Sequence, residues 1–159
     1  MSKTQDTAST AAPSASAAEQ PYLVVLLGEE IFVVSLPSVV KIINPIEIFP
    51  LPDTQEFILG IINFSGEIIP LVDLRLVLKL PAAAEDARCK FLICRHQEQK
   101  VAFTVDGVAD TWDLAPATFS ADTTRVGESD FIIGEGLVKG KVVGWIDMAA
   151  IITTHQAKP

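Results

Sequence analysis

The chain carries one pattern of residues twice, and this repeat restricts the folds that it can adopt. With a shift of 69 residues, Tyr22-Leu23-Val24 aligns with Phe91-Leu92-Ile93. With a shift of 74 residues, Phe57-Ile58-Leu59-Gly60 aligns with Phe131-Ile132-Ile133-Gly134. Turn glycines, aspartates and apolar positions agree in the same two alignments. We therefore expect two similar units, small enough that they must pack on each other, with a longer middle loop in the second unit within residues 114–130.

The apolar residues of both units favour strands. Hydrophobic residues make up 49% of the chain and aromatic residues only 7%, so most of the apolar content is Val, Ile and Leu, and β-branched side chains suit a pleated surface. Residues 22–34 and 57–72 each contain two apolar runs separated by a short turn, which is the pattern of a β-hairpin. The turn of the second hairpin is Ser65-Gly66. The sequence predicts an all-β protein with short helices, in which closing each sheet into a barrel would remove exposed edges.

Short helices are expected next to the hairpins. Ser35 suits the N-cap of one helix, and Val39 and Ile42 would follow on it and could face the core. Asp73 precedes residues 74–78, and its carboxylate can accept the free N–H groups of a first helical turn. A second short helix is therefore predicted there.

Charge and hydropathy exclude several classes of protein. The net charge is −8, whereas nucleic-acid binding requires clustered Lys and Arg. Apolar runs are interrupted well before the roughly 20 residues that a membrane helix needs. Residues 1–20 are rich in Ala, Ser and Thr and lack an apolar run, so a disordered leader is expected rather than a secretory signal; residues 154–159 form a tail. Carboxylate pairs such as Asp106 and Asp110 are expected in solvated turns.

No combination of residues indicates catalysis. Cys89 and Cys94 are five residues apart on an expected strand, on opposite faces and too far apart to bridge, so both are interpreted as structural thiols. His96 and His155 lie in a turn and near the C-terminus, where neither has a partner that would orient a catalytic base. Zinc would need clustered ligands. The sequence thus predicts no enzyme activity, no metal site and no cofactor.

Residues 57–75 closely resemble a motif of the CheW domain family. The family motif is apolar-Leu-Gly-Val-Ile-Asn-Leu-Arg-Gly followed by Pro, two apolar residues and Asp-Leu-Arg, and this chain reads FILGIINFSGEIIPLVDLR. Residues 27–32, 105–108 and 131–152 resemble further segments of the family in the same order. The resemblance covers about residues 22–152.

The resemblance implies both a fold and a role. The implied fold is two tandem, five-stranded, SH3-like β-barrels packed on each other, in a domain over residues 21–153 with repeats at about 22–80 and 90–152. The implied role is a non-enzymatic adaptor that couples the cytoplasmic tips of methyl-accepting chemoreceptors to the regulatory domain of a CheA-type histidine kinase. Such an adaptor is expected in the cytoplasm, recruited to membrane-associated arrays that control chemotaxis or pilus-based surface motility, without inserting into the membrane.

The resemblance also implies two contact sites. The receptor-contact turn would hold Gly60, Asn63, Ser65 and Gly66. The kinase-contact edge would hold Val39, Lys41 and Ile42. The family usually has Arg in place of Ser65 and often Glu in place of Lys41, and neither change is conservative for a charged contact. We therefore expect matching changes in the partners, as in a divergent chemosensory system.

The residues leave alternatives open. Gly60 and Gly66 could serve only the backbone conformation, and Asn63 could merely cap its turn. The function could instead be that of a regulatory adaptor for another partner outside chemotaxis. A small-ligand-binding β-barrel is a further alternative, although it would need a large cavity with converging polar groups, and barrels of five strands are filled by side chains.

Overall fold

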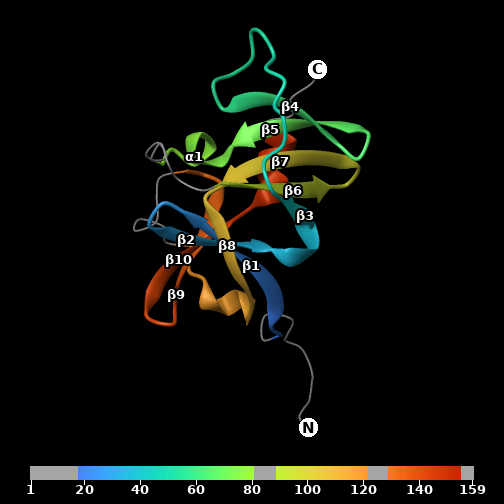
Figure 1. The fold of residues 1–159 in the computed structure, drawn as a ribbon. Coiled ribbons are helices and arrows are strands. Elements are labelled where there is room, and N and C mark those ends of the chain that lie inside the picture. The colour runs from blue at the N-terminus through green and yellow to red at the C-terminus, as the bar shows by residue number, and fades with distance from the viewer. Residues whose placement is uncertain (1–17, 81–88, 122–128, 155–159) are drawn as a thin grey trace.

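Ten strands form two packed sheets in the computed structural model, which describes residues 18–80, 89–121 and 129–154 (Figure 1). Sheet A has the order β8-β1-β2-β10-β9 and sheet B the order β3-β6-β7-β5-β4. The strands of sheet A are β1 (Gln20–Leu27), β2 (Glu30–Ser35), β8 (Gly107–Leu114), β9 (Ile132–Val138) and β10 (Lys141–Ile146). The strands of sheet B are β3 (Val39–Ile43), β4 (Ile58–Phe64), β5 (Glu67–Asp73), β6 (Lys90–His96) and β7 (Gln99–Val105).

The helices are short and lie at strand ends. They are α1 (Leu74–Val77), α2 (Met148–Thr154) and the 3-10 turns η3 (Leu36–Ser38) and η4 (Pro116–Thr118). The described part of the chain has no helix long and apolar enough to cross a membrane. The protein is therefore mostly β, as the sequence predicts.

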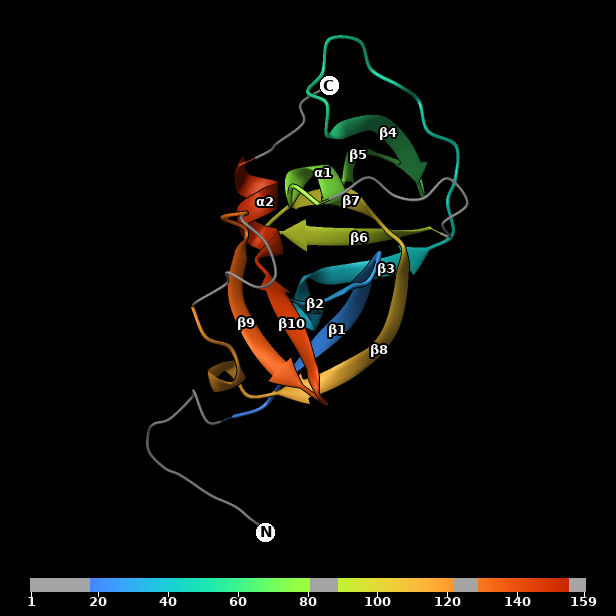
Figure 2. The same cartoon turned by 90° about the vertical axis from the view of Figure 1, so that its left-hand side faces the viewer.

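The two sheets do not correspond to the two halves of the chain. Hairpin β1–β2 comes from the first half but lies in sheet A between β8 and β10, and hairpin β6–β7 from the second half lies in sheet B between β3 and β5 (Figure 2). β2 pairs with β10 and β7 pairs with β5 in parallel, whereas the other neighbours are antiparallel. Each half thus contributes its first hairpin, β1–β2 or β6–β7, to the sheet that contains the remaining strands of the other half.

The pairing of the two sheets repeats in register. The antiparallel pairing of β3 with β6 skips Val40, and the pairing of β8 with β1 skips Ala109, which lies 69 positions later. The pairing of β4 with β5 skips Leu59, and the pairing of β9 with β10 skips Ile133, which lies 74 positions later. The two shifts seen in the sequence are thus the shifts that relate the bulges.

The prediction that each sheet closes into a barrel is wrong, because the end strands of each sheet are not paired in the described residues. Instead, in each sheet a single β-bridge joins the segment that follows one end strand, β3 or β8, to the end strand at the opposite edge, β4 or β9. Phe49 pairs with Ile61 of β4, with N–O distances of 2.8 and 2.9 Å, and Ser120 pairs with Glu135 of β9 at 2.8 Å. Prolines lack the N–H that a ladder needs, and three of them interrupt the first connection, at positions 45, 50 and 52.

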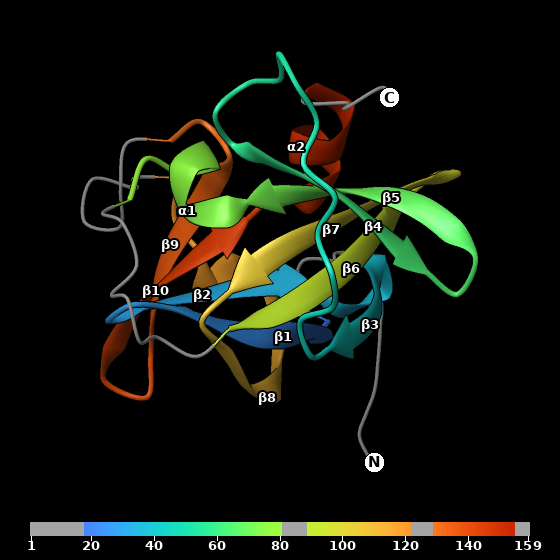
Figure 3. The same ribbon diagram turned by 45° about the horizontal axis from the view of Figure 1, so that its top comes forward.

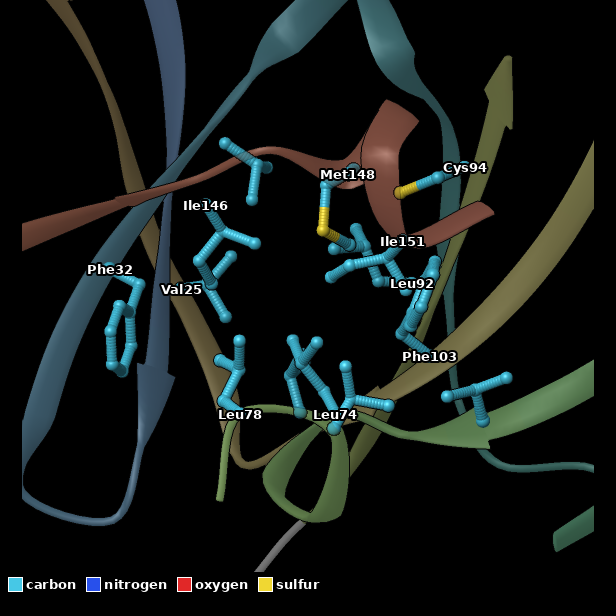
Figure 4. Packing of buried hydrophobic residues seen from close by; sticks show 14 of the residues in the cluster. Val25, Phe32, Leu74, Leu78, Leu92, Cys94, Phe103, Ile146, Met148 and Ile151 are labelled. Carbon is cyan, nitrogen blue, oxygen red and sulfur yellow. The ribbon is translucent and has the colours of Figure 1, made fainter. Parts of the chain in front are cut away.

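The largest cluster of buried side chains lies between the sheets (Figure 4). Alternation along β1 sends Leu23 and Val25 into this cluster and Tyr22 and Val24 into the interior of sheet A. Sheet B contributes β6 and β7 side chains to the same cluster, and α1 and α2 add theirs. Smaller clusters fill the interior of each sheet. The apolar content of the chain thus supplies two sheet interiors and one interface.

The helix expected after Ser35 is only a single turn. Residues 36–38 form a 3-10 turn in which Ser35 makes no side-chain cap bond, and Val39–Ile43 is strand β3. Four of the five residues in that run are β-branched, so they favour a strand over a helix. The prediction that Val39 and Ile42 lie on a helix is wrong.

The helix predicted after Asp73 is present. The Asp73 side chain accepts a hydrogen bond from the Arg75 N–H at 3.0 Å and caps α1. Asp147, which is 74 positions later, accepts from the Ala150 N–H at 3.1 Å at the start of α2. The same residue type therefore begins the helix of both halves.

Candidate interaction site

Three of the four residues assigned to the receptor contact lie at one exposed hairpin tip. Ser65 and Gly66 form the β4–β5 turn with φ angles of 51° and 85°, as in a type I′ turn. The Asn63 side-chain oxygen accepts a hydrogen bond from the Gly66 N–H at 3.0 Å. All three residues are exposed, and Figure 3 shows this hairpin projecting at the side of the molecule. The structure gives Asn63 a capping role and leaves the Ser65 side chain facing solvent.

The fourth residue, Gly60, is not at this surface. It is buried and has a φ of 146°, and a Cβ at this position would lie 2.5 Å from the Phe49 carbonyl oxygen. Glycine is therefore required for the close crossing of two backbone segments. The receptor contact of Gly60 stays a prediction, and its conformational role accounts for the glycine.

A hollow of about 230 Å³ opens beside this hairpin. Ile61, Ile68 and Pro70 line one side, and Ile68 is 55% exposed. The opposite side is formed by Glu98 of the β6–β7 turn and by the start of β7, where Lys100 forms an ion pair of 2.5 Å with Glu67. An apolar wall with a charged rim is a common composition for a protein-binding groove.

The residues assigned to the kinase contact lie on β3, the end strand of sheet B. Val39 is half-buried against the cluster between the sheets, whereas Lys41 and Ile42 are exposed. Val40, the bulged residue, is 42% exposed and adds a further apolar side chain. An end strand offers backbone groups as well as side chains to a partner. The structure thus presents one positive charge among aliphatic side chains along this edge.

An ion pair that the sequence did not reveal joins the two sheets. Arg75 of α1 donates from Nη2 to Asp106 Oδ2, and the same oxygen accepts the N–H of Gly28 in the β1–β2 turn. The Asp106 N–H donates to the Leu26 carbonyl at 3.0 Å. The expectation that Asp106 is a solvated turn carboxylate is wrong, because only 21% of its side chain is exposed. In the sequence, only the position of Asp106 directly after an apolar strand could have indicated that its carboxylate is largely buried.

The thiols are poorly suited to nucleophilic chemistry. Burial raises the pKa of Cys94 to about 12. Burial and then the charges of Asp106 and Asp73 raise the pKa of Cys89, which is half-buried. Both thiols are free, and a thiol that stays protonated is a weak nucleophile. Within residues 18–80, 89–121 and 129–154 there is no group of His, Cys, Asp and Glu suited to a metal ion; His155 lies outside these ranges.

The fold defines a class of mostly β proteins with two packed five-stranded sheets, and this chain exposes a hairpin tip and a strand edge. Residues 21–156 match the family model of the CheW-like domain, and the chain belongs to this family. Its members are scaffold and adaptor proteins of chemotaxis.

Relatives carry the same family name. The chemotaxis protein CheW of Klebsiella aerogenes is 24% identical over 142 residues, which cover 86% of this chain and 84% of that protein. The chemotaxis protein CheW of Helicobacter pylori is 28% identical over 85 residues, and the match spans about half of its length, 52%, and 54% of this chain. The scaffolding protein TtCheW of Thermoanaerobacter tengcongensis has a crystal structure with a TM-score of 0.74 at 24% identity, covering 82% of this chain and 85% of that one. This likeness shows the fold.

Proposed function

We propose that this chain is a non-enzymatic adaptor that couples chemoreceptor tips to a CheA-type histidine kinase. The observation that carries the proposal is the placement of its two candidate contact surfaces. The β3 edge and the β4–β5 hairpin lie at opposite ends of the strand order of sheet B. An adaptor must hold two partners at once, and two surfaces on different strands of one rigid sheet meet that requirement.

The receptor is assigned to the β4–β5 tip and the hollow beside it. Ile61 and Ile68 offer apolar contact to one face of a receptor helix, and Glu67 and Lys100 form the charged rim. Ser65 at the tip cannot replace the forked donors of an arginine. We therefore assign to this chain a receptor whose tip lacks the acceptor that an arginine would bind.

The kinase is assigned to the β3 edge. Lys41 is the exposed charge of this strand, and charge at the rim of an interface mainly sets partner choice and association rate. Lysine at this position favours a kinase regulatory domain with an acidic group opposite it. Both departures from the family pattern are consistent with a separate chemosensory system, for example one that controls pili or surface motility.

Calorimetric titration of the protein against the regulatory domain of the CheA-type kinase of its own organism tests the proposal. We expect a Kd of about 1–10 μM, a loss of about tenfold for Lys41→Glu, and no change for Ser65→Arg, which alters charge on the other surface. Tighter binding by Lys41→Glu would place the kinase on this edge but reject the charge matching. If no CheA-type kinase of the organism binds, the adaptor function is wrong while the fold is unaffected.

The small-ligand barrel receives no support from the described residues. Clusters of side chains fill the interior of both sheets, as expected for sheets of this size.

A further inference from the structure

A second hollow, of about 220 Å³, lies between the η3 turn and the start of α2. Its apolar wall is made by Ile133, Trp145 and Met148, and its polar side by Ser35, Ser38 and Asp147. Ile133 is the bulged residue of β9 and is 41% exposed. The hollow is separate from the β4–β5 tip. Its lining residue Ser38 precedes Val39 of the kinase-contact edge, but none of the residues assigned to either contact lines the hollow.

The repeat identifies the residues beside α1 that correspond to those at the hollow beside α2. The counterpart of Ala149, which lines the hollow, is Arg75, 74 positions earlier. The counterpart of Pro37 in the η3 turn is Asp106, 69 positions later. Beside α1, the Arg75 side chain extends to Asp106 and is almost fully buried. Beside α2 the two corresponding positions hold alanine and proline in place of this ion pair, and Ala149 lines an open hollow.

The walls of the hollow suit a long side chain with a cationic end. Ile133, Met148 and the half-buried Trp145 offer contact to an aliphatic stem, and an aromatic ring such as the indole also attracts a guanidinium. Asp147 uses Oδ1 to cap α2, and its other carboxylate oxygen has no partner among the described residues. Ser38 donates its hydroxyl proton to the Ser35 carbonyl at 2.7 Å, which leaves the lone pairs of Ser38 Oγ able to accept.

Electrostatics favours the same occupant. Asp147 carries the charge of the lining set, and the chain as a whole has a net charge of −8, so a cation is attracted and an anion is repelled. A guanidinium fits better than an ammonium, because it is planar, stacks on an aromatic face and donates to several acceptors at once.

We propose that this hollow binds an arginine side chain of a partner protein, in the place beside α2 that corresponds to the one that Arg75 fills beside α1. The guanidinium donates to the free oxygen of Asp147 and to Ser38 Oγ, and its aliphatic stem packs on Trp145. The assignment does not depend on which proteins contact the β3 edge or the β4–β5 tip.

Solution NMR of the full chain tests this with the capped tripeptide acetyl-Gly-Arg-Gly-amide as the probe. The two tryptophans provide a signal and a reference, because the Trp145 indole lines the hollow while Trp112 packs under Lys139, 4.9 Å from its Nζ. We expect a saturable shift of the Trp145 indole N–H, with a Kd of about 1 mM for a single side chain, and little shift of Trp112. The same tripeptide with norleucine in place of arginine is expected to bind about tenfold more weakly.

Matched variants separate the charge from the fold. Asp147→Asn keeps an oxygen that can cap α2 but removes the charge, and is expected to weaken binding about tenfold. Asp73→Asn makes the same change at the cap of α1 and should leave the titration unchanged. Ala149→Arg places an arginine at the hollow from within the chain and should abolish the response.

Four results would overturn the proposal, three from the titrations of the wild type and the two aspartate variants and one from Ala149→Arg. The first three are the absence of a saturable Trp145 shift, equal binding of the norleucine tripeptide, and equal loss of binding in Asp147→Asn and Asp73→Asn. Since Ala149→Arg leaves the cap of α2 in place, a normal response in this variant would also reject the hollow as the binding site.

Discussion

The first and second halves of the chain share hairpins, bulges and capped helices, yet they differ in chemistry where their side chains meet. Both halves skip one residue in each of two corresponding strand pairs, and both begin the helix at an aspartate. However, Arg75 in the first half corresponds to Ala149 in the second, and Asp106 corresponds to Pro37. The backbone pattern tolerates such exchanges because it depends on glycines, bulges and caps, whereas this ion pair between the halves is present beside α1 and absent at the corresponding positions beside α2.

The interiors of the two sheets also differ in the chemistry of corresponding side chains. Tyr22 in sheet A packs edge-on against Phe119 and Trp145 with ring centroids 5.7 Å away, while its counterpart Phe91 lies in an aliphatic cluster of sheet B. The Tyr22 hydroxyl has no hydrogen-bond partner among the described residues, and burial raises its pKa. Among the described residues, the core of sheet A therefore carries a buried polar side-chain atom without a hydrogen-bond partner, and the buried cluster of sheet B carries none.

The largest effect is expected where the halves differ most, at the Arg75–Asp106 pair. Arg75→Met removes the partner of a largely buried carboxylate, and should lower the free energy of unfolding by about 3 kcal/mol. Urea unfolding of Arg75→Met, Asp106→Asn and the double variant measures the loss of free energy of unfolding and the coupling between the two side chains. Asp106→Asn keeps an oxygen for the Gly28 N–H. The double variant should lose less than the sum of the single variants, and strictly additive losses would mean that the two side chains are not coupled.

A smaller effect is expected at two corresponding glycines. In Gly60→Ala the new Cβ meets the Phe49 carbonyl oxygen at 2.5 Å with φ at 146°, whereas in Gly134→Ala it meets the Phe119 side chain at 2.8 Å without a positive φ. A carbonyl obstacle together with the strain of a positive φ costs about 2 kcal/mol, whereas the contact with Phe119 Cβ, which moves only with its own backbone, adds no φ strain and costs about 1 kcal/mol. Thermal or urea unfolding should rank Gly60→Ala as the less stable variant. The reverse order would show that the crossing at Phe49 yields more easily than the Phe119 packing.

At neutral pH the smallest effect is expected at Cys94, which stands where the first half has Val25, because its thiol is protonated in both the folded and the unfolded chain there and affects stability only at alkaline pH. The folded protein holds the Cys94 proton up to a pKa of about 12, against an ordinary value of 9.0. Between these values the unfolded chain binds fewer protons, so stability falls as the pH rises, by about 1.4 kcal/mol per pH unit. Cys94→Val copies the other half and should flatten this fall. Urea unfolding of both proteins from about pH 8 to about pH 11 checks it, and parallel profiles would contradict it.

The local features could be predicted from the sequence because their signals are local. Ser65-Gly66 has the residue types of a tight turn, Asp73 precedes an apolar run as an N-cap does, and the shifts of 69 and 74 residues identify corresponding strands. The turn and the N-cap each depend on only a few neighbouring residues, and the shifts depend only on short segments that match each other. The β4–β5 hairpin and helix α1 could be predicted from these local signals.

The long-range features could not be predicted. The exchange of hairpins β1–β2 and β6–β7 leaves the hydrophobic pattern of every strand unchanged, so the pattern cannot reveal it. Strand β3 was mistaken for a helix because Ser35 and Pro37 are a valid helix start that the β-branched run overrides. The partners Arg75 and Asp106 are 31 residues apart, and only the folded backbone brings them together.

The exchange of hairpins also has a consequence for how the chain folds. The first half supplies β3, β4 and β5 to sheet B but not the two strands that lie between β3 and β5, so this sheet cannot be completed until residues 90–105 have left the ribosome. Sheet A depends in the same way on both ends of the chain. Pairings between distant segments slow folding, and neither half retains a complete sheet without the other. We therefore expect this pseudo-duplicated protein to unfold as one cooperative unit, despite its two sheets.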